Sequence, residues 1–441
     1  MTVSDETERG GEIDRMTSIP IISGFDRVRL ERLADWLAVG VAASLPWSTS
    51  ATGILIAAWL IAVLPTLDIA SVRRELATVA GGLPVLLWVL AAVGMLWADV
   101  SWAERIGGLG KFHRLLVIPL LLAQFRRSEH GIWVIYGFFA SMLGLLLMSW
   151  VAVAFPGLPW PGKEFGVPVK DYIIQGETFL ICAFALLGRA SDARGEKNPL
   201  FILGLVGLAV LFLVNIAFVA TGRTVLLVAP VLALLLGWRQ FRWQGLFGAV
   251  LLGGAVGGVF FLESPYLHGR LERSVTELQD YLNSDANNPT GLHLEFLRKS
   301  LSFVETAPII GHGTGSITEQ FRQAAAVGQT GASSVASANP HNQIFAVAIQ
   351  LGLLGTVVLV AMWTAHVMLF RGSGFIAWIG LIVVVQNIVS SLFNSHLFDF
   401  TQGWLYVFGV GVVGGMVLRE QSTAAAASPM AKPMNKPMNK P

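Results

Sequence analysis

The sequence predicts an all-α, polytopic membrane protein. Its 441 residues are 54% hydrophobic and only 13% charged, whereas soluble domains carry about 25% charged residues. Apolar runs of about 18 residues or more recur along the chain, and this is the length of helix that a bilayer requires. The alternating segments of about 10 residues that are typical of transmembrane barrels are absent. Helices are therefore expected to cross the membrane.

About twelve segments are apolar enough to be membrane helices. Lys111, His113 and Arg114 interrupt the fourth, so we expect an interfacial or broken helix there. The predicted segments are 30–46, 50–66, 81–98, 107–124, 131–155, 172–188, 200–220, 224–238, 245–262, 341–370, 374–393 and 402–418.

Basic residues predict the orientation, because cytoplasmic turns near helix ends are enriched in Lys and Arg. If the N-terminus is cytoplasmic, every turn on that side is basic: Arg73-Arg74, Arg126-Arg127, Arg189/Arg194/Lys197, Arg239/Arg242, Arg371, and Arg419 with the Lys-rich tail. We therefore expect a multi-pass inner-membrane protein with both termini in the cytoplasm.

This orientation divides the chain into five parts. They are a cytoplasmic N-terminal segment (1–29), nine helices (30–262), a large periplasmic loop (263–340), three helices (341–418) and a cytoplasmic tail (419–441). The Ala-rich and Lys-Pro-Met-Asn sequence of the tail predicts disorder, because it lacks the apolar residues of a core.

The 263–340 segment is the only long polar interval in the chain, and its patterns predict structure. Leu267, Leu271, Val275, Leu278 and Leu282 form one helical apolar stripe, and Leu294, Leu297, Leu301 and Val304 form a second stripe. Pro308 ends the second helix. We expect a flexible Gly-rich turn at 311–315 and a mobile lid at 324–340, which is rich in Ala, Ser and Gly.

Two arginines are candidates for binding an anion. Arg223 lies in the short outer turn Thr221-Gly222-Arg223-Thr224, where a Gly permits close approach and a guanidinium can bind phosphate through two hydrogen bonds. An interfacial Arg that reaches lipid phosphate is the alternative. Arg298 lies on the second loop helix, near the edge of its apolar stripe, and a solvated helix charge is the alternative there.

His341 is the candidate base. An imidazole with a pKa of about 6.5 can accept a proton near neutral pH. It begins the tenth predicted segment, next to the neutral donors and acceptors of Asn339, Asn342 and Gln343, and an interfacial capping His is the alternative. The residues expected to help bind substrate are Asn342, Gln343, Lys163, Lys170, Gly313 and His312, whereas His396 and Asp399 in the last outer turn are weaker candidates.

Several absences narrow the chemistry. The chain has no nucleotide-binding Gly-x-x-x-x-Gly-Lys-Ser/Thr loop and no His or Cys cluster with metal-ligand spacing, so we expect neither a metal nor another cofactor. The single cysteine, Cys182, forms no internal disulfide. No charged residue is evident at mid-membrane, which argues against a proton-coupled transporter.

These motifs together resemble the O-antigen ligase and polymerase superfamily. The features that carry the resemblance are the Thr221 to Thr224 turn, the loop helix with Arg298, the Pro308-x-x-Gly311-x-Gly313-x-Gly315 turn and Pro340-His341-Asn342. They occupy only about 222–355, although the layout of the whole chain is similar. The resemblance implies a GT-C-like membrane glycosyltransferase in which His341, Arg298 and Arg223 are catalytic.

The resemblance also implies the substrates. The family transfers glycans from undecaprenyl diphosphate, and the single dominant loop most resembles the ligase branch, which uses lipid A–core oligosaccharide as acceptor in lipopolysaccharide biosynthesis. Attack by a sugar hydroxyl in line with the leaving diphosphate would invert the anomeric carbon, with His341 as base and the arginines on the diphosphate. Membrane lipids are expected partners and nucleic acid is not.

Three alternatives remain open from the sequence. The first two are an O-antigen polymerase and a protein O-oligosaccharyltransferase, which share the Gly turn and the His-Asn pair. The third, from another class, is a lipid or glycan transporter or flippase in which the loop is an external gate. Neither the glycan nor the oligomeric state follows from the sequence.

Overall fold

The computed structural model describes residues 26–427, apart from Lys163, 194–197, Thr221, Ser264 and Gln329. Within helices, the side chains of Arg223, Leu252, 255–268, 270–271, Ala425 and Ala427 also lie outside the description. The described part is all-helical, as the sequence predicts, and it contains one isolated bridge between Glu164 and Val167 but no strand.

The helices fall into a long first set, a short middle set and a closing set. The first set comprises α1 (Arg27–Ser44), α2 (Thr49–Val63), α3 (Ile69–Leu76), α4 (Val79–Gly94), α5 (Trp102–Gly110), α6 (Val117–Arg127), α7 (Gly131–Ala154), α8 (Tyr172–Asp192), α9 (Pro199–Phe218) and α10 (Arg223–Glu263). The middle set comprises α11 (Pro265–Ser284), α12 (Pro289–Thr306) and α13 (Ile317–Val327). The closing set comprises α14 (Gln343–Leu369), α15 (Phe375–Ser390), α16 (Phe400–Phe408), the π-helical turn η4 (Gly409–Val413) and α17 (Gly414–Ala427).

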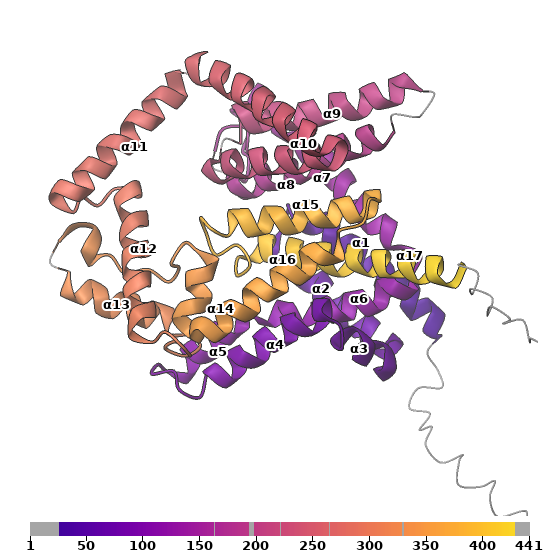
Figure 1. Cartoon of the computed structure of the whole chain (residues 1–441), viewed down its shortest axis with the longest axis horizontal. Helices are drawn as coiled ribbons and strands as arrows, with labels where there is room; N and C mark the ends of the chain where they lie inside the picture. The colour runs from indigo at the N-terminus through magenta and orange to yellow at the C-terminus, as the bar shows by residue number, and fades with distance from the viewer. Residues whose placement is uncertain are drawn as a thin grey trace, which may run out of the picture.

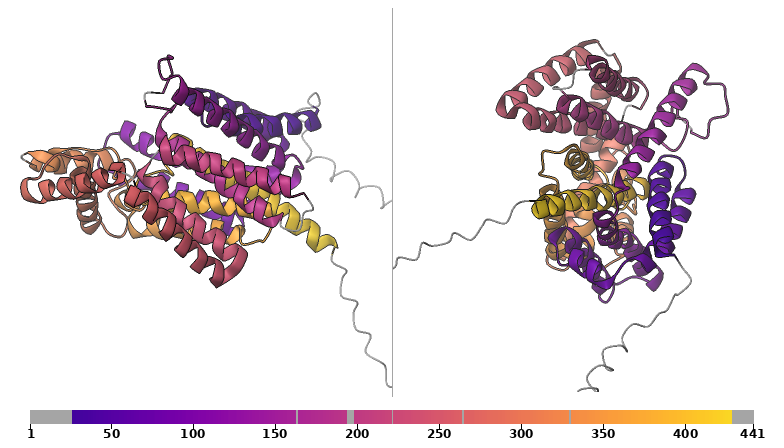
Figure 2. Two further views of the ribbon diagram at one scale, coloured as in Figure 1. Left: turned by 90° about the horizontal axis from the view of Figure 1, so that it is seen from above. Right: turned by 90° about the vertical axis from the view of Figure 1, so that its right-hand side faces the viewer.

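The middle set forms a lobe at one end of the bundle, which we call the lobe end (Figure 1). Helix α1 begins and α17 ends at the opposite end, which we call the termini end (Figures 1 and 2). The bundle helices run between these two ends. The predicted polar interval is therefore gathered outside the bundle, on the side away from both chain ends.

Among the described residues, seven helices are long and apolar enough to cross a membrane, or up to nine if each of two bent pairs is one span. The bent pairs are α3 with α4, at 85°, and α5 with the 113–127 helix, at 44°. The second pair confirms the prediction of a broken fourth segment. By these criteria, the structure supports a multi-pass membrane protein. They do not confirm the predicted number of twelve spans.

Some predicted boundaries were wrong. Helix α17 continues to Ala427, past the predicted start of the tail at 419, while 428–441 and 1–25 lie outside the described residues. By contrast, the predicted break between segments 224–238 and 245–262 is present, because the backbone within α10 is non-helical at Arg242 (φ 52°, ψ −130°). Gly237 and Gly245 lie against each other across this break, where a Cβ on either would meet the other's carbonyl oxygen within 2.4 Å.

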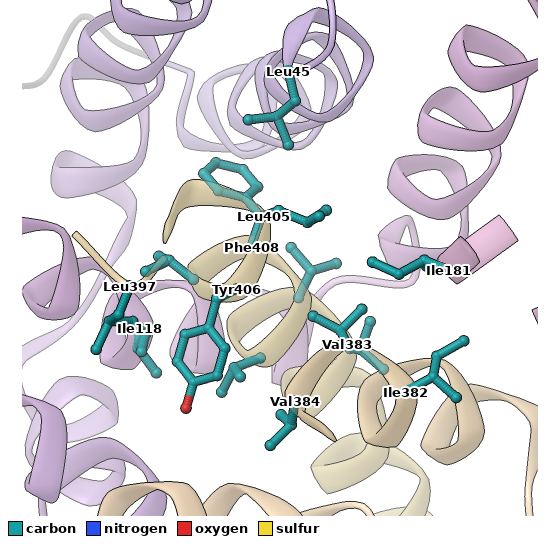
Figure 3. Packing of buried hydrophobic residues seen from close by; sticks show 14 of the residues in the cluster. Leu45, Ile118, Ile181, Ile382, Val383, Val384, Leu397, Leu405, Tyr406 and Phe408 are labelled. Carbon is teal, nitrogen blue, oxygen red and sulfur yellow. The ribbon is translucent and has the colours of Figure 1, made fainter. Parts of the chain in front are cut away.

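The core lies where α1, α8, α15 and α16 meet. Figure 3 shows Leu45, Ile181, Val383 and Phe408 converging there, and the side chains of Tyr406 and Val407 are also buried. Because a lipid environment provides little hydrophobic drive between helices, close packing of such side chains holds the bundle together. This core fixes the helix ends that carry the polar residues.

A break in α14 joins the lobe to the bundle. Gly352 has φ 60° and ψ −153°, so the carbonyls of Ile349 and Gln350 lose their helical partners. The predicted Gly turn supplies donors instead: His312 N–H donates to Ile349 (2.8 Å) and Gly313 N–H donates to Gln350 (2.9 Å). The Gly turn therefore forms main-chain hydrogen bonds with the broken part of α14, and we call this arrangement the backbone splice. It is not the freely flexible segment that the sequence suggested.

Glycine is required in this splice for two reasons. Gly311, Gly313 and Gly315 have φ of 69°, 89° and 92°, a region that disfavours side chains. A Cβ on Gly313 would also lie 2.4 Å from the Cα of Ala98. The spacing of the glycines thus reflects close backbone contact with the ends of α4, α5 and the first half of α14.

Candidate active site

His341 lies where the lobe meets the bundle. Its ring stacks on Phe296 of α12, with 5.6 Å between ring centroids and 13° between planes, and it lies 6.2 Å from the His293 ring. Its backbone has φ 54°, a left-handed conformation that costs energy in a residue other than Gly. Backbone strain of this kind is concentrated at functional sites.

Asn339 holds this strained backbone in place. Its Oδ1 accepts hydrogen bonds from His341 N–H (2.9 Å) and from the Ser395 hydroxyl (2.7 Å). Its Nδ2 donates to Asn394 Oδ1 at 2.8 Å. One amide side chain therefore links the segment before α14 to the 391–399 turn between α15 and α16.

Asn342 and Gln343 strengthen the same link. Asn342 caps α14, because its Oδ1 accepts from the N–H groups of Ile344 (2.9 Å) and Phe345 (3.2 Å). Gln343 is buried and its Oε1 accepts from Leu397 N–H at 3.1 Å. The Nε2 of Gln343 is also buried and has no hydrogen-bond partner in the described structure, so it remains available as a donor.

A buried carboxylate–histidine cluster lies behind this junction. His396 Nδ1 is 3.0 Å from Asp399 Oδ2, and His396 Nε2 is 3.1 Å from Glu177 Oε1 on α8. Asn394 Nδ2 also donates to Asp399 Oδ2, at 3.2 Å. Polar contacts thus continue from Asn339 through Asn394 and Asp399 to the interior.

Glu177 is a buried carboxylate that the sequence did not single out. Its side chain is 2% exposed and lies within the candidate span Tyr172–Asp192, so at least one carboxylate is buried in a membrane helix. A Glu within the apolar run of α8 was the available signal. Because buried ionisable groups in membrane segments mark functional sites by default, Glu177 deserves a test.

The two histidines differ in their electrostatic environment. Burial lowers the pKa of His341, and this outweighs the raising effects of a hydrogen bond with Asn394 and the charge of Asp399. Burial would also lower the pKa of His396, but hydrogen bonds with Asp399 and Glu177 and their charges raise it to about 9. His341 is therefore neutral and able to accept a proton at pH 7, whereas His396 is protonated.

Cationic side chains border the 391–399 turn. Arg114 donates to the carbonyls of Asp399 and Phe398, the latter at 3.1 Å. Lys170 donates to the Leu45 carbonyl and to the Thr401 hydroxyl (2.9 Å). Burial lowers the pKa of Lys170 to about 8, although the charge of Asp171 opposes this change.

Arg298 does not contact His341. It forms a two-pronged pair with Glu295 on α12, with Nε–Oε2 at 2.8 Å and Nη2–Oε1 at 2.7 Å, and its side chain is 69% exposed. Phe296 faces His341. Arg298 follows two residues later, about 200° around the helix axis at 3.6 residues per turn, and so lies on the opposite side of α12. The Nη1 edge of the guanidinium remains directed away from Glu295.

The predicted apolar stripes were wrong in part. On α12 the buried face carries Glu295, Phe296, Lys299 and Phe303, while Leu301 is exposed. Phe296 and Phe303 pack edge-on against Phe321 of α13, and these aromatic contacts set the rotation of the helix. On α11, Val275 and Leu282 are exposed, and the side chains of Leu267 and Leu271 lie outside the description.

The predicted lid is anchored to α12. Lys299 Nζ donates to the carbonyls of Ser333 (2.6 Å) and Val335 (3.2 Å). The carboxylate of Asp285 accepts from Ser333 N–H at 3.1 Å. Buried charged and backbone groups therefore hold residues 331–335 in place.

The remaining predicted site residues take several positions. The Gly313 N–H is occupied by Gln350, and His312 Nε2 donates to the Phe303 carbonyl at 2.8 Å. Arg223 begins α10, but its side chain and all of Lys163 lie outside the described residues. The structure thus brings together His341, Asn339, Asn342 and Gln343, which the sequence singles out, with Asn394 and Phe296, which sequence reasoning missed.

The fold and site define a polytopic helical membrane protein with a polar junction at the lobe end of its bundle. Residues 208–360 match the family model described as O-antigen ligase. The match runs from α9 into α14 and contains Arg223, Arg298, Gly313 and His341. It confirms the resemblance to the O-antigen ligase superfamily. No curated protein matches the chain.

Proposed function

We propose that this protein transfers O-antigen glycan from undecaprenyl diphosphate to lipid A–core oligosaccharide. The observation that carries the proposal is the position of His341. This residue belongs to the family-matched segment and lies where the lobe, α14 and the 391–399 turn meet. A junction of this kind can hold the donor and the acceptor hydroxyl next to the same base. An acceptor hydroxyl free in solution would instead be exposed to water.

His341 acts as the base in this proposal. Stacking on Phe296 orients the ring, and the hydrogen bond from the backbone N–H of His341 to Asn339 fixes the backbone. The burial that lowers its pKa keeps the imidazole neutral at pH 7. It removes the proton from the acceptor hydroxyl as the oxygen bonds to the anomeric carbon and the carbon–diphosphate oxygen bond breaks. The anomeric centre is inverted, and His341 leaves the step protonated.

Arg298 and Arg223 stabilise the departing diphosphate. The pair with Glu295 occupies the Nε–Nη2 edge of Arg298 and orients the guanidinium. Its other edge can donate to phosphate oxygens, which gain charge as the glycosidic bond breaks. Since Arg298 lies on the opposite face of α12 from His341, this role requires the lobe to shift or the diphosphate to extend across α12.

The apolar surface of the bundle suits substrates with long tails. A cavity of about 50 Å³ is lined by apolar residues alone, with Leu45, Phe138, Ile181 and Phe408 among them. One of its lining residues, Leu45, accepts a hydrogen bond from the ammonium group of Lys170 through its carbonyl. We propose that the lobe is periplasmic, that both termini are cytoplasmic and that twelve segments cross the membrane, with the break at Arg242 dividing two of them.

The test is His341→Ala in cells that make a full-length surface glycan. Loss of a general base lowers rates by about 10² to 10⁴-fold, so ladders of glycan on lipid A–core should disappear while carrier-linked glycan accumulates. His113→Ala, which changes an exposed histidine outside the junction, is the matched control. Membrane abundance of both variants is measured alongside.

The outcomes separate the alternatives. Normal ladders in His341→Ala would contradict the proposed role of His341. Shortened glycan still attached to lipid A–core would favour the polymerase. Purified protein with lipid-linked donor and lipid A–core, assayed in chelator, distinguishes transfer from transport, because a flippase forms no new glycosidic bond.

A further inference from the structure

A polar cavity of about 220 Å³ opens at the termini end, where α1 begins. Its walls come from α1, from Thr66, from the end of α6 and from the 128–130 turn before α7. Helix α1 and α17 meet this end of the bundle, and the lobe with His341 lies at the other (Figure 1). The cavity is therefore separate from the proposed transfer site.

A buried carboxylate forms the inner wall. Asp35 is 6% exposed and accepts hydrogen bonds from Gln124 Nε2 (2.8 Å) and the Ser128 hydroxyl (2.7 Å). His130 Nδ1 lies 3.1 Å from its Oδ2. Gln124 is held in turn by the Trp59 indole N–H at 2.9 Å. A carboxylate has about four acceptor positions, so one remains for a ligand.

Most of the other charges around the cavity are already paired. Glu31 pairs with Arg27 at 3.3 Å, Glu129 pairs with Arg419, and Arg127 pairs with Asp68 at 3.5 Å. Arg32 lines the cavity, is exposed and has no ion pair or hydrogen bond among the described residues. The wall thus presents one free guanidinium and one buried carboxylate.

The cavity borders an exposed aromatic cluster. Trp36 of α1 and Trp133 of α7 have ring centroids 6.1 Å apart, and Tyr136 lies 5.8 Å from Trp133. All three side chains are exposed although they belong to bundle helices. Exposed Trp and Tyr on membrane helices are enriched at the level of the lipid headgroups. Trp36 follows Asp35 directly, so the cavity lies at that level.

We propose that this cavity binds the headgroup of a membrane phospholipid that carries both a phosphodiester and a primary ammonium group. Arg32 binds the phosphodiester, and the ammonium group donates to the free acceptor position of Asp35. The acyl chains run along the apolar surface beside Trp36 and Trp133. This inference does not depend on the proposed glycan transfer.

The charges explain the choice of headgroup. A purely anionic lipid would satisfy Arg32 but would place no positive charge beside the buried carboxylate of Asp35. A quaternary ammonium has no N–H to donate to Asp35. A headgroup with one phosphate and one primary ammonium complements the free guanidinium of Arg32 and the open acceptor position of Asp35, and it fits near the interfacial rings.

The experiment measures lipid retention by native mass spectrometry of the purified full-length protein. The probes are phosphatidylethanolamine, phosphatidylcholine and phosphatidylglycerol with identical acyl chains. We expect the unaltered protein to retain the ethanolamine lipid best, and Arg32→Gln to retain it about tenfold less, because a hydrogen bond to a charged group is lost. Arg29→Gln, an exposed arginine on the same helix that does not line the cavity, should behave as wild type.

A second variant tests the carboxylate. Asp35→Asn should reduce the preference for ethanolamine over choline while leaving some phosphate-dependent retention. If Asp35→Asn fails to fold, the comparison of Arg32→Gln with Arg29→Gln still decides. Equal retention by these two arginine variants, or equal retention of all three lipids by wild type, would overturn the proposal.

Discussion

The two ends of the bundle each bury a carboxylate, but they neutralise it differently. At the lobe end, Glu177 pairs with His396 at 3.1 Å. At the termini end, Glu75 is fully buried between Arg74 Nε (2.9 Å) and Arg126 Nη1 (3.1 Å). Arginine keeps its charge at every accessible pH, whereas histidine can lose its proton. The Glu75 site is therefore electrostatically fixed, whereas the Glu177 site is titratable.

The backbone differs between the ends as well. At the lobe end a Gly turn inserts into the break of α14 and contacts α5, so main-chain hydrogen bonds hold the elements together. At the termini end, side chains make the connections: Arg126 reaches Ser422 (3.2 Å) and Arg419 pairs with Glu129.

The largest expected effect comes from opening the backbone splice. A Cβ on Gly108 would lie 2.5 Å from the Cα of Gly315, so Gly108→Ala should lower the free energy of unfolding by about 2–4 kcal/mol through overpacking. Thermal unfolding in detergent measures it. The neighbouring Gly107 has open space around its Cβ position, and Gly107→Ala should be neutral or stabilising. Equal unfolding temperatures for the two variants would contradict the close contact between Gly108 and Gly315.

A smaller effect is expected from the ion pairs of the termini end. Glu75→Gln leaves Arg74 and Arg126 facing each other without a counter-charge, which should cost about 1–3 kcal/mol because both arginines are partly solvated. Glu129→Gln removes an exposed partner of Arg419 and should change stability by less than about 0.5 kcal/mol. Chemical denaturation compares them. A Glu129 variant as unstable as the Glu75 variant would show that burial is not the deciding factor.

The smallest effect is a pH dependence that arises at His396 in the lobe end. The folded pKa of His396 is about 9, above its unfolded value of about 6.5. Its contribution to stability is therefore complete below pH 6.5 and is lost as pH rises through 9. The unfolding temperature of wild type should fall across this window more than that of His396→Gln. Parallel curves would mean that His396 is not protonated between its two carboxylates.

Much of the secondary structure followed from the sequence. The apolar runs gave the bundle helices, and Lys111, His113 and Arg114 located the bend before α6. The rotation of α12 did not follow, because aromatic packing against Phe321 overrode the leucine stripe. The periodicity of a sequence shows which residues of a helix are apolar. It does not show which other residues they will pack against.

The candidate site was predicted only in part. His341, Asn339, Asn342 and Gln343 were identified because polar residues at the start of an apolar run are conspicuous. Asn339 and its partner Asn394 are 55 positions apart, and no local pattern connects them. The hydrogen bonds between the Gly turn and α14 could not be predicted either, since they depend on the break in the helix at Gly352.

The sequence by itself determined that this is an all-helical membrane protein with a polar segment between its ninth and tenth predicted spans, because bilayer thickness and hydropathy constrain such segments directly. Only the tertiary structure decided that the glycines splice two chain segments, that Arg298 faces away from His341 and that Glu177 and His396 share a buried pair. These features depend on contacts between residues distant in sequence, whose geometry arises when the helices pack.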